Sequence, residues 1–314
     1  MRKPFILSAA AIIAAAFLSC SKDDETTTKP SLSGITITSV SPYLAVGESV
    51  TFTINASKVV NSSDDEDFEP GNIGVWWQVN SATRDTITLD ISSLAKFTKT
   101  YRPDTLGNYT ITCGAFTVEE TCYSTSATTT FQAIDPENAI EGLAGTRVPG
   151  EKYLTVTAGG LTWMAENLYE TASGISYNGC EVMNAVFGRY YSQEEALTAC
   201  PDGWRLPTAA EWDALGQDAG ALMANASFLG TYFWTYTKDV PITNATGFNA
   251  IAVGYVDKTG IETYVNGEKE YAAFWTSDTN GDLGMLRYIY GSNPLVQSGE
   301  ASKTSLALSV RCVK

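Results

Sequence analysis

The chain has 314 residues, enough for two domains, and its hydrophobic content of 44% is typical of a folded protein. Its formal net charge of −15 argues against a nucleic acid partner, because phosphate binding needs a basic surface. It contains no histidine, so the commonest general base and the commonest metal ligand are excluded.

Residues 1–19 have the pattern of a lipoprotein signal peptide. Arg2 and Lys3 give a positive start, and residues 5–17 form an apolar run too short to span a bilayer. The run ends in Phe-Leu-Ser-Cys, which resembles a bacterial lipobox and implies cleavage before Cys20 and lipidation of that cysteine. An ordinary signal peptide followed by a chance cysteine is the alternative.

Residues 20–33 are predicted to be a lipidated, acidic and flexible tether. The segment from Ser21 to Glu25 resembles the export signal of Bacteroidota surface lipoproteins, and a merely solvated tether is the alternative. We therefore expect a protein held in the outer membrane by its lipid anchor and facing the cell exterior.

Residues 34–135 are predicted to form an immunoglobulin/PKD-like all-β sandwich. Short segments of alternating apolar and polar residues recur along this region, which is typical of antiparallel sandwiches. The Gly-Asn-Tyr-Thr sequence at 107–110 resembles such modules, which usually act as spacers, with ligand binding as the alternative. The acidic residues at 64–69 indicate a solvated loop tip, with calcium binding as the alternative.

Residues 136–314 are organised around the segment from Cys200 to Trp212. Ser192 with Glu195, and Thr208 with Glu211, have the spacing of capping boxes, so a helix is predicted to start after each of them. The sequence Pro-Asp-Gly after Cys200 predicts a tight turn between the two helices.

Four segments of this half carry a family resemblance. They are Trp-Met-Ala-Glu-Asn-Leu at 163–168, Gly-Arg-Tyr-Tyr at 188–191, the segment 199–212, and Val-Arg-Cys-Val at 310–313. Together they resemble the Fibrobacter succinogenes major paralogous domain, here in a lipoprotein of Bacteroidota. The resemblance implies a C-type-lectin-like α+β fold for residues 136–314. It implies no defined activity.

The cysteines predict two disulfides in an oxidising compartment. Cys200 and Cys312 form the preferred bridge, which would hold the last strand beside the centre of the domain. Cys113 and Cys122 fit a hairpin bridge within the sandwich. Cys180 is then left over as a buried thiol, and its role stays open.

No motif predicts a catalytic residue, a cofactor or a metal ligand set. Residues 278–282 begin like a calcium loop, but the glycine and glutamate that an EF-hand needs later in the loop are replaced by Leu283 and Ile289. A polar loop is the expected structure there, and calcium binding is the alternative.

The candidate binding residues are aromatic, because aromatic faces suit sugar rings and protein contacts. They are Tyr232, Tyr236, Tyr264, Trp275, Tyr288 and Tyr290, and core packing is the alternative for each. We expect a non-catalytic surface lipoprotein that presents a glycan- or protein-binding domain. A structural or accessory subunit of a surface appendage or coat is the alternative, and a polysaccharide-active enzyme is the third.

Overall fold

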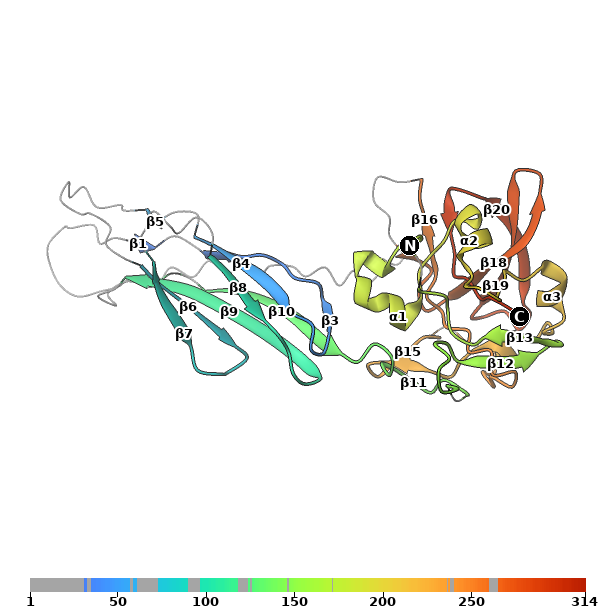
Figure 1. Ribbon diagram of the computed structural model, residues 1–314, viewed down its shortest axis with the longest axis horizontal. Coiled ribbons are helices and arrows are strands. Elements are labelled where there is room, and N and C mark those ends of the chain that lie inside the picture. The colour runs from blue at the N-terminus through green and yellow to red at the C-terminus, as the bar shows by residue number, and fades with distance from the viewer. Residues whose placement is uncertain are drawn as a thin grey trace, which may run out of the picture. The chain divides into compact units, whose positions relative to one another are not determined.

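The computed structural model divides between Asp135 and Pro136 into two compact units (Figure 1). It describes residues 31–32, 35–56, 59–60, 73–89, 97–117, 124, 126–145, 147–170, 172–235, 237, 240–259 and 265–314. The signal peptide, the lipidation site Cys20 and the acidic loop at 64–69 lie outside these residues. So do Cys122, Tyr236 and Tyr264.

The first unit is a β-sandwich of two sheets. The three-stranded sheet has the order β2–β4–β8, and the five-stranded sheet has the order β3–β10–β9–β6–β7. The strands of the first sheet are β2 (Ile35–Ile37), β4 (Val50–Ala56) and β8 (Phe97–Tyr101). Those of the second are β3 (Tyr43–Ala45), β6 (Ile73–Val79), β7 (Asp85–Leu89), β9 (Gly107–Thr117) and β10 (Ala127–Ile134). A separate pair joins β1 (Ser31–Leu32) to β5 (Val59–Val60).

The alternating sequence pattern produces the core of this sandwich. Val50, Phe52 and Ile54 of β4 are buried, whereas the intervening Thr51 is exposed and Thr53 is half-buried. This period of two places one face of the strand against the opposite sheet. Ile111 of β9 lies in the same buried cluster, so the predicted two-sheet architecture is confirmed.

The predicted disulfide between Cys113 and Cys122 is not formed. Cys113 is a free, buried thiol. The register of the hairpin gives the reason, because Cys113 on β9 lies opposite Ala127 at the start of β10. The nine-residue spacing suggested cross-strand neighbours, but β9 continues to Thr117, so Cys113 lies within a paired part of the strand, and Cys122 lies outside the described residues.

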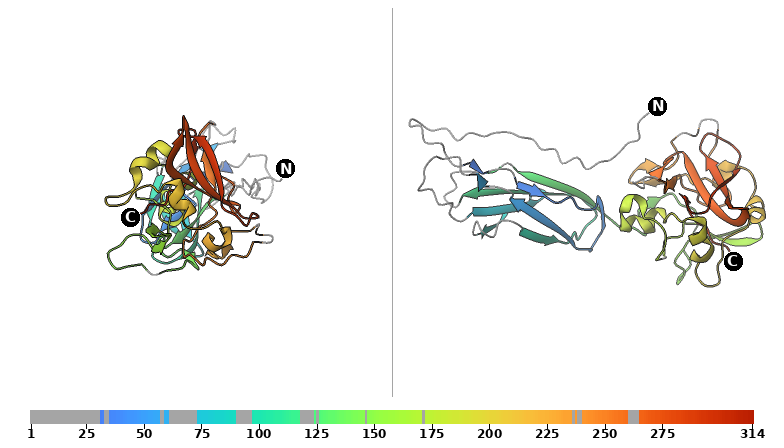
Figure 2. Two further views of the ribbon diagram at one scale, coloured as in Figure 1. Left: turned by 90° about the vertical axis from the view of Figure 1, so that its right-hand side faces the viewer. Right: turned by 90° about the horizontal axis from the view of Figure 1, so that it is seen from above.

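The second unit consists of short strands and short helices. Its small sheets are β11 (Ile140–Glu141), β14 (Ser227–Phe228) and β15 (Thr231–Tyr232); β12 (Thr155–Ala158) and β13 (Leu161–Met164); and β16 (Tyr255–Asp257), β17 (Val265–Asn266) and β21 (Leu306–Ala307). The longest ribbon, orange to red in Figures 1 and 2, comprises β18 (Tyr271–Asn280), β19 (Leu283–Tyr290) and β20 (Gln297–Ser302). The helices are α1 (Asn184–Phe187), α2 (Gln193–Ala199), α3 (Ala209–Asp213) and α4 (Ala219–Leu222), with 3-10 turns at Tyr177–Gly179 and Glu181–Met183.

Both predicted capping boxes are present and start α2 and α3. The Ser192 side chain accepts a hydrogen bond from the Glu195 backbone N–H, and the Glu195 carboxylate accepts one from the Ser192 backbone N–H. Thr208 and Glu211 make the same reciprocal pair at α3. Each box satisfies two N–H groups that have no partner within the helix.

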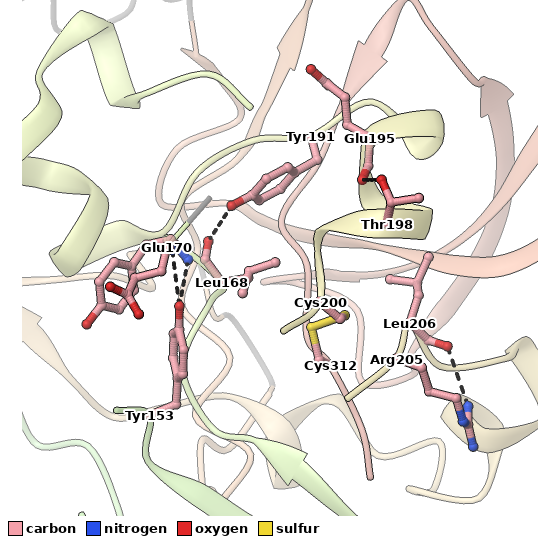
Figure 3. The surroundings of a disulfide bond; sticks show 11 residues. Tyr153, Leu168, Glu170, Tyr191, Glu195, Thr198, Cys200, Arg205, Leu206 and Cys312 are labelled. Carbon is pink, nitrogen blue, oxygen red and sulfur yellow. Dashed lines mark hydrogen bonds between the residues drawn. A yellow bond between two sulfur atoms is a disulfide. The ribbon is translucent and has the colours of Figure 1, made fainter. Parts of the chain in front are cut away.

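A disulfide joins α2 to the last segment of the chain. The Cα atoms of Cys200 and Cys312 lie 5.9 Å apart, and their sulfur atoms are bonded, so this predicted bridge is confirmed (Figure 3). Residues 310–313 are buried, and Cys312 also accepts a backbone hydrogen bond from Met164. The C-terminal segment is thereby fixed within the core of the unit.

Among the described residues, no helix combines the length and the apolar character needed to cross a membrane. The second unit has both helices and strands, and its C-type-lectin-like topology stays a prediction.

Candidate binding site

The structure separates the predicted aromatic binding residues into core and surface. Trp275 on β18 is fully buried, and its indole Nε1 donates a hydrogen bond to the Tyr191 carbonyl at 2.7 Å. The prediction that Trp275 contributes to a binding surface is therefore wrong. The physical reason is that the middle of β18 is buried on both faces, so its side chains do not alternate between core and solvent.

Tyr288 and Tyr290 lie together in a cluster with two further tyrosines, Tyr255 and Tyr271. The rings of Tyr271 and Tyr290 stack with centroids 4.6 Å apart, and Tyr255 and Tyr288 each lie within 6.4 Å of Tyr271. All four are half-buried. Burial and the neighbouring tyrosines raise the pKa of Tyr271 above its usual value. The four rings pack mainly against one another and against the edge of the core.

Of the predicted binding residues that the structure describes, Tyr232 is the one that is largely exposed to solvent, with 57% of its surface accessible. It lies on β15, the second strand of a hairpin whose two-residue turn is Leu229-Gly230. Both turn residues have positive φ, 50° for Leu229 and 76° for Gly230, as a type I′ turn requires. Glycine accepts this conformation readily, whereas a leucine there costs about 1–2 kcal/mol.

A hollow of about 370 Å³ lies beside Tyr232, and we call it the Tyr232 hollow. Its volume falls in the range of small-molecule and side-chain pockets. The described residues of its lining are neutral, and they include both apolar and hydrogen-bonding side chains. They are Ala224, Asn225, Ala226, Tyr232, Trp234, Thr235, Thr237 and Ile242.

The base of the hollow is held firmly by the core. Trp234 is buried, and its Nε1 donates a hydrogen bond to the Ala250 carbonyl at 3.0 Å. The same carbonyl accepts the backbone N–H of Ala224 at 2.9 Å. Two lining residues are therefore bonded to one buried residue, whereas Tyr232 is exposed to solvent. This arrangement suits a preformed site rather than one assembled by the ligand.

The chemistry of the lining favours an uncharged ligand. Asn225, Thr235 and Thr237 offer amide and hydroxyl groups, and Tyr232 and Trp234 offer aromatic surface. The lining residues that the structure describes are all uncharged. Amide, hydroxyl and aromatic groups of this kind suit hydrogen bonding to a ligand and stacking against it.

A smaller cavity of about 20 Å³ lies beside the buried Arg311, with Glu166, Asn167 and Asn249 in its lining. It has room for about one water molecule. Because most of the polar groups around it already bond to one another, it belongs to the core.

The Fibrobacter succinogenes major domain matches residues 156–314, half of the chain. The chain belongs to this family. The four segments that carry the family resemblance contribute to the core of the domain, since one residue from each, Trp163, Tyr190, Trp212 and Arg311, is buried. None of the eight residues of the Tyr232 hollow comes from these segments.

The chain was also compared with curated proteins and with solved structures. No curated protein matches the chain. Among solved structures, the PKD domain of an M14-like peptidase from Thermoplasmatales archaeon SCGC AB-540-F20 is similar, with 11% sequence identity and a TM-score of 0.25. The similarity covers 34% of this chain and 97% of that one.

The sequence prediction found Tyr232 but missed the rest of the hollow. Thr235, Thr237 and Asn225 are ordinary polar residues, and nothing in their spacing predicts that they converge. One signal of the hairpin was present in the sequence. Leu229 and Gly230 separate the short segments Ser-Phe and Thr-Tyr, and this spacing fits two strands joined by a two-residue turn.

Proposed function

We propose that this protein is a non-catalytic recognition protein, in which the Fibrobacter succinogenes major domain binds an uncharged ligand at the Tyr232 hollow. The observation that supports the proposal is the hollow itself, which has the exposed aromatic ring of Tyr232 in its lining and is neutral over the residues that the structure describes. Exposed aromatic rings next to preformed pockets are common anchors of binding energy.

The proposal includes attachment of the protein to the outer membrane through lipid on Cys20, with both units outside the cell. The support is the signal-like sequence that ends at Cys20 and the acidic tether that follows it. Replacement of Cys20 by alanine should abolish incorporation of labelled palmitate and release the protein from the membrane fraction. Protease added to intact cells should digest the wild-type protein if it faces the exterior.

Binding is tested with paired glycan and peptide arrays, each probed with residues 21–314 of the chain, which keep every residue that the structure describes. Tyr232→Ala and Tyr232→Phe serve as the matched variants. We expect a ligand whose binding falls about tenfold in Tyr232→Ala and much less in Tyr232→Phe, because the ring supplies most of the contact. Binding that is equal in all three proteins would refute this site.

The second candidate function is a structural subunit of a surface assembly, and one observation in the first unit favours it. The edge strand β7 pairs only with β6 among the described strands, and Asp85 to Thr88 are exposed on it. Such an edge can accept a strand from another subunit. Replacement of Thr86 and Thr88 by proline should then abolish assembly in sedimentation experiments without affecting ligand binding at Tyr232.

A further inference from the structure

The turn at Leu229 combines two unfavourable features. Its φ of 50° strains a branched side chain, and 44% of that apolar side chain is exposed to solvent. Asparagine or aspartate is the usual residue at the first central position of a type I′ turn. A leucine at this position strains the turn and exposes apolar surface to water. Both costs suggest that its side chain contacts a binding partner.

The hairpin also presents an open backbone edge next to this leucine. β14 lies between β11 and β15, so β15 has a neighbour on one side only among the described strands. The Phe233 N–H donates to the Ala226 carbonyl, which makes this pair hydrogen-bonded. Because hydrogen-bonded and non-hydrogen-bonded pairs alternate, the backbone N–H and C=O of Tyr232 face away from β14.

Three features therefore meet at one place, the strained Leu229, the outward backbone groups of Tyr232 and the neutral hollow beside it. We propose that an extended, uncharged segment of a partner protein adds to the outer edge of β15 and places one apolar side chain in the Tyr232 hollow. The added segment would exchange backbone hydrogen bonds with Tyr232 and cover Leu229. This inference rests on the proposed function and names its ligand class.

The net charge of the chain favours a different protein over a second copy of this chain. Two copies that each carry a net charge of −15 repel one another. The described residues of the hollow are neutral, so none of them offers a cation to offset that repulsion. A glycan would use the aromatic ring and the hydroxyl groups, but it gives no role to the exposed Leu229 or to the open strand edge.

The test uses an array of 15-residue peptides probed with residues 21–314. We expect the bound peptides to share alternating β-branched residues around one large apolar side chain. The strongest peptide should bind about tenfold more weakly to Tyr232→Ala and about fivefold more weakly to Leu229→Asn. Leu229→Asn should at the same time raise the melting temperature of the second unit by about 2–4 °C, because the turn strain is relieved. If Leu229→Asn gains stability and loses peptide binding, Leu229 contacts the peptide. A purely structural residue would not lose binding while the fold becomes more stable.

Two controls sharpen the result. Leu197→Gln removes another exposed leucine, on α2, and should leave peptide binding unchanged. Hydrogen exchange of the Tyr232 amide should slow when the peptide is bound, as strand addition requires. Peptide binding that survives both hairpin variants, or that leaves this amide unprotected, would overturn the inference.

The same arrays separate the two levels of the proposal. A glycan that binds through Tyr232 while no peptide binds would keep the proposed function and overturn the inference. Binding of neither class would overturn both.

Discussion

The Nε atom of Arg311 donates a hydrogen bond to Oδ1 of Asn167 at 2.7 Å, across 144 residues of the chain. The guanidinium also donates to the carbonyls of Met164, Phe248 and Asn249, and it lies over the Phe248 ring at 4.7 Å. Burial lowers the pKa of Arg311 to about 9, so the group is still charged at pH 7. Four oxygen acceptors stabilise this charge, and the nearby Glu166 carboxylate also favours it.

Replacement of Arg311 by methionine should destabilise the second unit by at least about 3 kcal/mol, because several buried oxygens lose their donor together. Urea unfolding followed by tryptophan fluorescence measures the change. Arg205→Met is the matched control, since its partner is the partly exposed Glu211, and it should cost about 1 kcal/mol or less. Equal losses in the two variants would contradict the central structural role of Arg311.

The disulfide between Cys200 and Cys312 closes a loop with a sequence separation of 112 residues. By the loop-entropy relation, its loss should cost about 4–5 kcal/mol. The double variant Cys200→Ala/Cys312→Ala should therefore melt at a much lower temperature than the oxidised protein, and reductant should lower the melting temperature of the wild type only. If reductant left the wild type unchanged, the bridge would not stabilise the fold.

The ion pair of Glu211 with Arg205 predicts a pH dependence. The hydrogen bond from Arg205 lowers the pKa of Glu211 from 4.5 to about 2. As the pH falls, the unfolded chain takes up this proton first, so the stabilisation is complete above about pH 4.5 and is lost towards pH 2. Glu211→Gln keeps the geometry of the capping box and removes the charge. It should lower stability at pH 7 by about 1 kcal/mol and flatten the loss below pH 4.5. Parallel pH curves for both proteins would exclude the effect.

The Cys113 thiol should resist alkylation in the folded protein. Its side chain is fully buried, and burial raises its pKa to about 12, so little thiolate exists at pH 8. Iodoacetamide followed by mass spectrometry should label Cys113 only after denaturation. Labelling of the native protein would contradict the burial. Failure to label even the denatured, unreduced chain would show that Cys113 is oxidised after all.

The parts of the fold that depend on local spacing could be predicted from the sequence. The two capping boxes depend on residues three positions apart, and the sandwich strands depend on a period of two. The Cys200–Cys312 bridge was predictable because the strand before Cys312 was expected to return beside the central segment that contains Cys200. Cys113 was predicted wrongly, since the register of β9 against β10 is not contained in the spacing of the cysteines.

The candidate site was harder to predict because exposure depends on tertiary packing. Trp275 and Tyr232 are both aromatic residues on strands, yet one is fully buried and the other is 57% exposed. The apolar run Ala-Ala-Phe-Trp at 272–275 is typical of a strand buried on both faces and could have placed Trp275 in the core. The strain at Leu229 could not be predicted, because the preferred asparagine–glycine signal of a type I′ turn is missing there.

The central claim is that ligand recognition takes place at the Tyr232 hollow of the second unit. The most direct measurement is an NMR titration of the isotope-labelled chain, residues 21–314, with the strongest ligand from the glycan and peptide arrays. We predict shifts of the backbone amides from Ala224 to Thr235 and of the Trp234 indole N–H, whose place beside the hollow is fixed by its bond to Ala250. Shifts confined to the first unit or to the cluster of Tyr255, Tyr271, Tyr288 and Tyr290 would contradict the claim.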